Sequence, residues 1–270
     1  MKIMDIIGYV FLLLISKHLL ASEPIIFSTA PTHSSEKTIE MYQPLLNYLS
    51  EEIGRPVIMK MAVNFTDYNI KMQHNKYDFL FDGPQFVNWR MLKFGHEPLV
   101  RLPGSIKIVI ISKTSKNINA MKDLIGKRVC TFPSPNLLTM IFLDNFQNPM
   151  RQPIMVPARG FKGIEACLEN PSSVAAVLRD KLWNKIKDKD GLMVLYAPAH
   201  AYPERTFSIS KGIDLLTRQK IKNALLNNRG KEAAKNIFAV FKRKKFIEST
   251  EDEYKGAAKL LQPIWGYELR

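Results

Sequence analysis

The fold is indicated first by one stretch of the chain, Asn75-Lys-Tyr-Asp-Phe-Leu-Phe-Asp-Gly-Pro-Gln-Phe86. Residues 78–81 are apolar apart from the opening acid, and turn-forming residues bound them, so they predict a short buried strand. Asp82-Gly-Pro84 then ends the strand and opens a helix over residues 85–94, because proline is tolerated in a first helical turn. In an open α/β sheet ligands bind at such strand ends, and a helix N-terminus favours an anion. An ordinary strand–helix turn explains the stretch equally well.

The N-terminal residues predict an exported protein. Lys2 precedes an apolar run from Ile6 to Ile15, which is too short to span a bilayer comfortably and fits a secretory signal peptide. We predict cleavage after Ala21, with a retained amphipathic anchor as the alternative. The 270 residues, 46% hydrophobic and 24% charged, suit a folded protein of two modest lobes or one large domain. We therefore expect a soluble periplasmic chain.

The two cysteines and the net charge indicate less about function than the N-terminal residues do. Neither Cys130 nor Cys167 follows the signal peptide, so lipid attachment there is not expected. Export permits a disulfide, but buried free thiols explain two cysteines on separate predicted elements equally well, so the sequence leaves both possibilities open. The net charge of +14 is spread along the chain, with dense runs at 181–189 and 242–245 that are typical of solvated helix faces. No nucleic-acid-binding motif accompanies it. A positive surface can still attract anionic ligands or anionic lipid.

Strands and helices alternate along most of the chain, which predicts an α/β fold with largely parallel sheets and helices on both faces. The order strand, loop, helix, strand, helix, strand, helix occurs over residues 25–94 and again over 127–187. Two lobes follow, joined by extended crossings near residues 102–112 and 196–207. Helices at 214–227, 231–241 and 251–261 return to the first lobe. The predicted domains are a signal peptide (1–21), lobe 1 (22–105 plus 205–270) and lobe 2 (106–204).

Several short motifs stand in a specific order and spacing. They are Ala30-Pro-Thr32, Tyr42-Gln-Pro-Leu-Leu46, Gly54-Arg-Pro-Val57, Asp78 to Pro84, Leu124-Ile-Gly-Lys-Arg-Val129 and Phe132-Pro-Ser-Pro135. In these motifs, over nearly all of residues 25–227, the sequence resembles the PhnD-like family of periplasmic phosphonate-binding proteins, the substrate-binding components of ABC importers. The resemblance implies a type II periplasmic binding fold, with ligand held in a cleft between two lobes that a hinge of two crossing strands connects.

Two segments depart from the family pattern. The family usually places small hydroxyl residues after Pro-Ser-Pro, whereas this chain has Asn136-Leu-Leu-Thr139. The family's frequent histidine before the next helix is replaced by Arg159-Gly-Phe-Lys162. Arg159 or Lys162 could supply a cation in place of a neutral donor, or both could be ordinary surface residues.

Polar residues at the carboxyl ends of the predicted strands would line the cleft. Tyr42 lies on an apolar helical stripe and is interpreted as core. Asp82 could pair with the amine of a zwitterionic ligand, although capping of the following helix is the favoured role. The predicted ligand-binding residues are Thr32, Ser34, Ser35, Tyr68, Asp82, Gly83, Gln85, Ser134, Asn136, Thr139 and Lys162.

The sequence carries no nucleophile, metal-binding or dinucleotide motif, and its histidines are scattered, so we predict a binding protein with no catalytic residue, metal or cofactor. The leading hypothesis is a monomeric solute receptor that captures an anionic or zwitterionic, phosphonate-like ligand for an ABC permease. The alternative is a periplasmic sensor or scaffold of the same fold, with a degenerate pocket, that signals to a membrane partner. The leucines at 137 and 138, in place of the expected hydroxyls, motivate that alternative.

Overall fold

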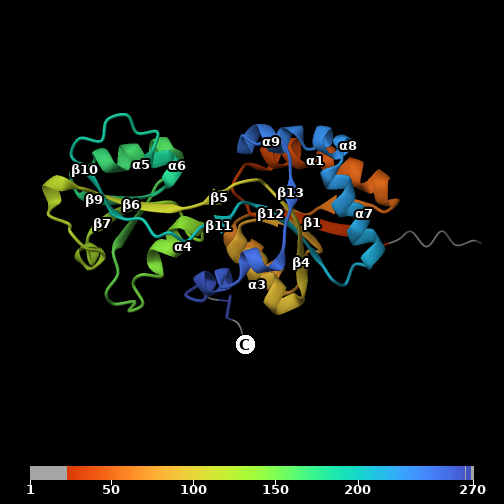
Figure 1. Ribbon diagram of the computed structural model, residues 1–270. Helices are drawn as coiled ribbons and strands as arrows, with labels where there is room; N and C mark the ends of the chain where they lie inside the picture. Colours follow the sequence, from red (N-terminus) through yellow and green to blue (C-terminus); the bar gives the residue numbers. More distant parts are fainter. Residues whose placement is uncertain (1–22, 265, 269–270) are drawn as a thin grey trace, which may run out of the picture.

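Two β-sheets divide the chain into two lobes, and a narrow two-stranded connection joins them (Figure 1). The structure is a computed structural model and describes residues 23–264 and 266–268. The predicted signal peptide lies outside the described residues. None of the helices in these two ranges combines the length and apolar character that crossing a bilayer requires.

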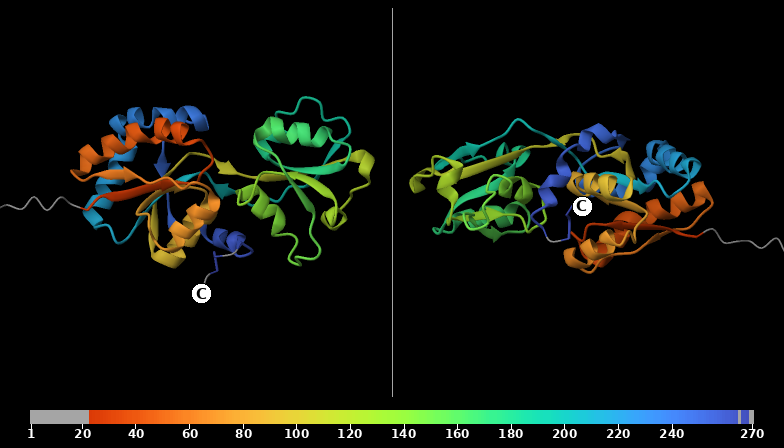
Figure 2. Two further views of the ribbon diagram at one scale, coloured as in Figure 1. Left: turned by 180° about the vertical axis from the view of Figure 1, so that it is seen from behind. Right: turned by 90° about the horizontal axis from the view of Figure 1, so that it is seen from below.

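Lobe 1 is built on a six-stranded sheet with the order β13-β4-β12-β3-β1-β2. The strands are β1 (Ile25–Thr29), β2 (Val57–Met59), β3 (Phe79–Asp82), β4 (His96–Arg101), β12 (Thr206–Ser210) and β13 (Ile247–Glu248). Helices α1 (Ser35–Ile53), α7 (Leu215–Leu226), α8 (Asn228–Ala233) and α9 (Lys235–Phe241) cover one face, and α2 (Phe65–Gln73) and α3 (Pro84–Phe94) cover the other (Figures 1 and 2).

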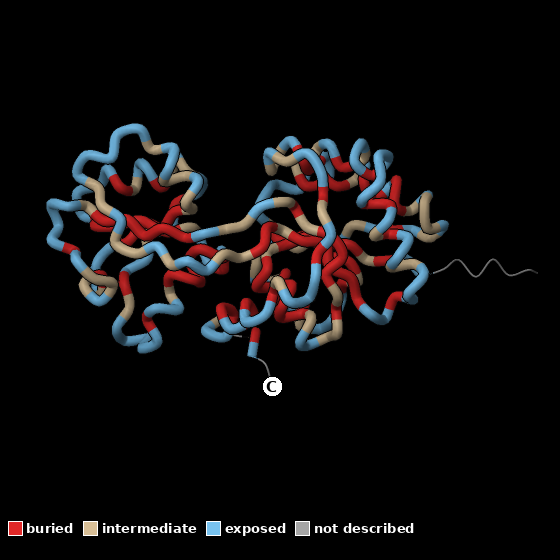
Figure 3. Tube along the Cα trace, in the orientation of Figure 1, coloured by how far each residue is buried: buried red, intermediate tan, exposed pale blue. Residues whose placement is uncertain are grey.

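Lobe 2 is built on a five-stranded sheet with the order β10-β6-β9-β7-β8. The strands are β6 (Ile108–Lys113), β7 (Arg128–Thr131), β8 (Ile154–Pro157), β9 (Ser173–Arg179) and β10 (Leu192–Tyr196). Helix α4 (Leu137–Leu143) packs on one face, and α5 (Gly160–Glu169) and α6 (Asp180–Trp183) on the other; η1 (Thr114–Lys116) and η2 (Met121–Leu124) are single 3₁₀ turns. Buried chain runs through the centre of each lobe (Figure 3).

The predicted twofold pattern is confirmed, since β1-α1-β2-α2-β3-α3 and β7-α4-β8-α5-β9-α6 have the same order. The predicted predominance of parallel pairing is not. Strand β1 pairs in parallel with β2 and β3, and β7 with β8 and β9, but the remaining pairs are antiparallel. Both sheets are therefore mixed, because the chain re-enters each sheet from its opposite end after crossing between lobes.

The connection between the lobes is an antiparallel pair of β5 (Ser105–Ile106) and β11 (Tyr202–Pro203). These two strands lie within the predicted crossings. Beside them Glu204, which is buried, binds Arg179 from the end of β9 at 2.7 Å and Arg243 from the region after α9 at 2.5 Å. Through these two ion pairs, Glu204 links the connection to Arg179 of lobe 2 and to Arg243 of lobe 1.

Helix α1 is continuous, although it contains Pro44, and a proline inside a helix commonly causes a kink or a break. Ser34 caps the N-terminus by accepting a hydrogen bond from Lys37, and Gly54 ends the helix in the left-handed conformation. Pro44 has no N–H to donate to the Glu40 carbonyl one turn earlier. The side-chain amide of Asn236, on α9, donates to that carbonyl at 2.7 Å instead. A tertiary contact thus replaces the hydrogen bond that proline removes.

Cys130 on β7 and Cys167 on α5 form a disulfide, with Cα atoms 5.9 Å apart. Of the two possibilities that the sequence left open, the structure therefore shows the bridge. Strand and helix lie far apart in the sequence, but α5 packs directly on the face of the sheet that carries Cys130.

The predicted helix at 251–261 is instead two 3₁₀ segments, η3 (Glu251–Tyr254) and η4 (Ala257–Leu261), because Gly256 adopts a positive φ of 80° between them. We call residues 251–268 the C-terminal segment. Leu260 belongs to the core of lobe 2, whereas Leu261 packs with α3 in lobe 1. The chain end therefore contacts both lobes, rather than only the first as predicted.

Candidate functional site

Asp82, the last residue of β3, forms a buried ion pair with Arg90 of α3. The two Arg90 terminal nitrogens donate to the two carboxylate oxygens at 2.7 and 2.8 Å, and both side chains are almost fully buried. Asp82 does not cap α3, whose N-cap residue is Gly83. The predicted capping role is therefore wrong, and the carboxylate is not accessible to a ligand amine in this structure.

Two hydroxyls complete this network. Tyr68 of α2 donates to Asp82 at 2.5 Å, and Arg90 donates to the Ser208 hydroxyl of β12 at 2.8 Å. Burial, and then the negative charge of Asp82, raises the pKa of the Tyr68 phenol well above its usual value. Tyr68 is thus a neutral donor held inside lobe 1, and its predicted direct contact with ligand is not possible in this arrangement.

The turn after β3 reaches lobe 2 through Gln85. The Gln85 side-chain nitrogen donates to the Pro135 carbonyl at 3.2 Å, while the side-chain oxygen is buried without a hydrogen-bond partner among the described residues. A Cβ at Gly83 would lie 2.5 Å from the Gln85 side-chain oxygen, so a larger residue there would require the Gln85 side chain to move. The turn after β3 in lobe 1 therefore contacts the turn after β7 in lobe 2.

The loop from β1 to α1 exposes Thr32, Ser34 and Ser35, as expected for residues that meet a ligand. Ser34 uses its hydroxyl as the α1 cap, and the free N–H groups of the first helical turn lie beside it. The pKa of His33 in the same loop is lowered by partial burial and by the positive charges of Arg205 and Lys37.

Arg205 is the residue that sequence reasoning missed. It immediately precedes Thr206, which pairs with Asp82 across the sheet, and its guanidinium lies 5.3 Å from the centre of the Phe241 ring. It influences the pKa values of both His33 and the buried Tyr42. Within the described residues it has no carboxylate partner. A partly exposed cation in an extended crossing matches no motif, so only the fold brings it beside the α1 loop.

In lobe 2 the predicted residues serve different roles. Ser134 and Asn136 are exposed at the strand-end turn, and Asn136 caps α4 by accepting from the Leu138 N–H at 3.0 Å. Thr139 is buried and donates to the Phe132 carbonyl at 2.7 Å, so its predicted ligand contact is not available in this structure. Leu137 and Leu138 are buried in the lobe 2 core. Their place in the sequence suggested that these leucines occupy the ligand region, but the structure places them in the core instead.

Lys162 and Arg159 are exposed at the start of α5, and neither has a carboxylate partner in the part of the chain that the structure describes. In the same part, no group of histidine, cysteine, aspartate or glutamate side chains is arranged to hold a metal ion. The strand ends of the two lobes thus carry exposed hydroxyls, helix N-termini and cations without carboxylate partners among the described residues.

A profile of the family described as "ABC transporter, phosphonate, periplasmic substrate-binding protein" matches residues 27–254. The chain belongs to this family. Substrate-binding proteins of ABC transporters are not enzymes, and family membership agrees with the periplasmic location expected from the sequence. No curated protein sequence matches the chain significantly.

Solved structures of phosphonate-binding family members and related proteins share the fold. A Xanthomonas citri protein bound to ATP has a TM-score of 0.70 at 12% identity, covering 90% of this chain and 98% of that one. The PhnD1 protein of Prochlorococcus marinus in complex with methylphosphonate has a TM-score of 0.64 at 14% identity, covering 89% and 98%. A binding component of a Pseudomonas aeruginosa ABC phosphonate transporter has a TM-score of 0.61 at 14% identity, covering 88% and 85%. The type II periplasmic binding fold is confirmed.

Proposed function

We propose that this chain binds a small phosphonate-like anion between its two lobes and delivers it to an ABC permease. The observation that carries the proposal is Arg205, a cation without a carboxylate partner in the described residues, placed beside the loop that opens α1. Hydroxyls of Thr32 and Ser35 and the N–H groups of the α1 start would supply further donors. Lys162 would approach the same anion from lobe 2.

The buried ion pair restricts the chemical class of the proposed ligand. The sequence left both anionic and zwitterionic ligands open, with Asp82 as the partner of an amine. Asp82 is already bound to Arg90 and Tyr68, so it cannot serve that purpose without breaking a buried network. We therefore favour an anion without an amine.

Burial of Leu137 and Leu138 removes the reason for expecting a degenerate pocket, so we favour transport over the sensor alternative. Contacts from both lobes to one ligand would favour a closed state by rotation at the β5–β11 connection. We propose that Gln85, at the point where the two turns meet, shifts its hydrogen bond during that rotation. The chain would act as a monomer after removal of residues 1–21.

The test is isothermal titration with methylphosphonate, phosphate and methanesulfonate, comparing the native chain with Arg205→Gln. Because a charge-assisted hydrogen bond to an anion is lost, the affinity should fall by about 10- to 100-fold. Arg151→Gln, which changes an exposed arginine of lobe 2, should leave the affinity unchanged. Binding that is equally tight in Arg205→Gln would refute the assigned site, and no binding of any of the three anions would refute the ligand class.

A further inference from the structure

Positive charge is concentrated on the helical face of lobe 1. Ten lysines and arginines but only one acid lie between Leu215 and Lys245, the segment that forms α7, α8 and α9. This is a large share of the net charge of +14 of the whole chain. At the end of α9 this face adjoins the lobe connection, because the Phe241 ring lies 5.3 Å from the Arg205 guanidinium and Arg243 pairs with Glu204.

Some of these cations are neutralised by neighbours. Lys222 pairs with Glu248, Arg229 with Glu52, and Lys235 with Glu232. Arg218 and Arg243 are held by Glu97 and Glu204.

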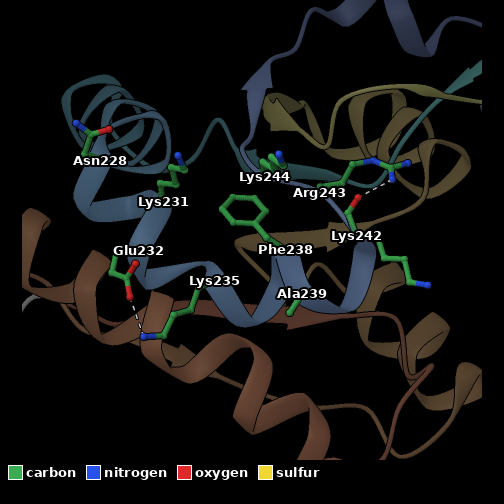
Figure 4. A pocket seen from close by; sticks show the side chains of 9 residues that line it. All are labelled: Asn228, Lys231, Glu232, Lys235, Phe238, Ala239, Lys242, Arg243 and Lys244. Carbon is green, nitrogen blue, oxygen red and sulfur yellow. Dashed lines mark hydrogen bonds and ion pairs between the residues drawn. The ribbon is translucent and has the colours of Figure 1, made fainter.

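Three other lysines, which line one groove, are not paired with a carboxylate among the described residues. These lysines, Lys231, Lys242 and Lys244, line a hollow of about 800 Å³ together with Phe238 and Ala239. Lys231 and Lys244 lie on the same side of the Phe238 ring, and the Lys242 side chain points away from them (Figure 4). Lys242 is held there by a left-handed backbone conformation at the end of α9, with a φ of 52°. We call this hollow the basic groove. Its lysines are available to an external anion.

Exposed leucines lie on α7, the helix that packs against α8. Leu215 and Leu226 of α7 are 59% and 37% exposed, and Leu216 is 63% exposed. Leu215 and Leu226 are eleven residues apart, so they project from nearly the same side of the helix, about 20° apart. Leu226 is separated by one residue from Asn228, which lines the groove. Lysines and large apolar side chains are therefore presented by adjoining helices.

Lysines together with exposed leucines form the kind of protein surface that binds to an anionic bilayer. Lysines attract headgroup phosphates, and neighbouring leucines enter the boundary between headgroups and acyl chains. A small free anion fits less well, because the groove is open and none of the described residues that line it is a buried polar side chain. An acidic protein would neutralise the lysines but would not explain the leucines.

We infer that the helical face of lobe 1, through the basic groove and the leucines of α7, docks on an anionic phospholipid surface. Such docking keeps the protein at the membrane where a permease resides. The inference does not depend on which solute the chain binds.

The test is co-sedimentation of the chain without residues 1–21, whose apolar run would insert by itself, with phosphatidylcholine vesicles with or without phosphatidylglycerol. We expect binding only to the vesicles that contain phosphatidylglycerol, and its loss in about 1 M salt. The triple variant Lys231→Gln, Lys242→Gln, Lys244→Gln should bind on the order of a hundredfold more weakly, since each lysine near an anionic surface contributes about fivefold.

The matched control neutralises three exposed lysines of lobe 2, in Lys116→Gln, Lys122→Gln, Lys127→Gln. It has the same net charge as the groove variant and should bind like the native chain. An equal loss in the control would overturn the inference, as would absence of binding by the native chain at physiological salt. Leu215→Ser with Leu216→Ser should weaken vesicle binding several-fold and leave binding to polyglutamate unchanged. If the leucine variant binds vesicles normally and polyglutamate competes fully, the partner is an acidic protein and the bilayer proposal fails.

Discussion

Arg90 and Asp82 are joined by two parallel hydrogen bonds inside lobe 1, with Tyr68 and Ser208 completing the network. The pair connects the end of β3 to the middle of α3, so it fixes the angle at which the turn between them leaves the sheet. That turn carries Gln85, which contacts lobe 2. A buried charge pair thereby sets the position of a turn at the lobe boundary.

Asp82→Asn should lower the free energy of unfolding by about 3–5 kcal/mol, because it leaves the Arg90 charge buried and uncompensated. Urea unfolding followed by circular dichroism measures the loss. Adding Arg90→Met should restore part of the stability, since no unpaired charge then remains. Glu232→Gln, at a fully solvated ion pair, is the control and should change little. A loss of under about 1 kcal/mol in Asp82→Asn would contradict the structural assignment.

His96 makes stability depend on pH. Burial, and then the charge of Arg90, lowers its pKa from 6.5 to about 3, and neither ring nitrogen has a hydrogen-bond partner among the described residues. The unfolded chain takes up a proton below pH 6.5, whereas the folded chain does so only near pH 3. Stability should therefore be full above pH 6.5 and fall as the pH drops towards 3, by up to about 1.4 kcal/mol per pH unit.

His96→Leu should remove that contribution, giving a smaller slope of unfolding free energy between pH 6 and pH 4, measured by urea titration at each pH. His200→Gln changes an exposed histidine and should keep the native slope. Identical slopes in the native chain and His96→Leu would show that His96 is not the group responsible.

The disulfide between Cys130 and Cys167 closes a loop over a sequence separation of 37 residues. By the chain-entropy relation, Cys130→Ala with Cys167→Ala should lower the free energy of unfolding by about 3–4 kcal/mol. Comparing urea unfolding of the native chain with and without dithiothreitol provides an independent measurement. A reductant that leaves the unfolding midpoint unchanged would mean that the bridge does not form in the folded protein.

Leu260 joins the C-terminal segment to the core of lobe 2. Leu260→Ala should destabilise the protein by about 2–5 kcal/mol, since it removes a buried leucine. Because the same segment is anchored in lobe 1 by Leu261 and by the hydrogen bond from Trp89 to the Tyr267 carbonyl at 3.0 Å, the variant should also broaden the interlobe distance distribution measured between spin labels. Leu92→Ala, at an exposed leucine of α3, should alter neither quantity.

The sequence predicted the repeated order of elements because hydrophobic periodicity and turn residues are local signals. It did not predict the partner of Asp82, since Arg90 lies eight residues away and Ser208 lies 118 residues from Arg90. Local reasoning favoured helix capping, which needs only the next few residues. The end of the chain was misjudged because Gly256 interrupts an otherwise helical spacing.

The candidate site was predictable only in part. The loop hydroxyls near Thr32 and the turn at Gly83 follow from the positions of strand ends. Arg205 could not be recognised as a ligand-binding candidate from the sequence, because only the pairing of β12 with β3 brings it close to the other candidate residues. The structural role of Leu137 and Leu138 was also hidden, since sequence position alone does not tell which side of a short helix faces the core.

The order in which the chain contributes strands to the two sheets has a consequence for export. The sheet of lobe 2 is continuous between Ile108 and Tyr196, whereas the sheet of lobe 1 needs β1 from the start and β13 near the end of the chain. If the predicted signal peptide exports the chain with its N-terminus first, all strands of lobe 2 would emerge before β12 and β13, which complete the sheet of lobe 1. We therefore expect the protein to hold a solute only after nearly all of it has left the translocation channel.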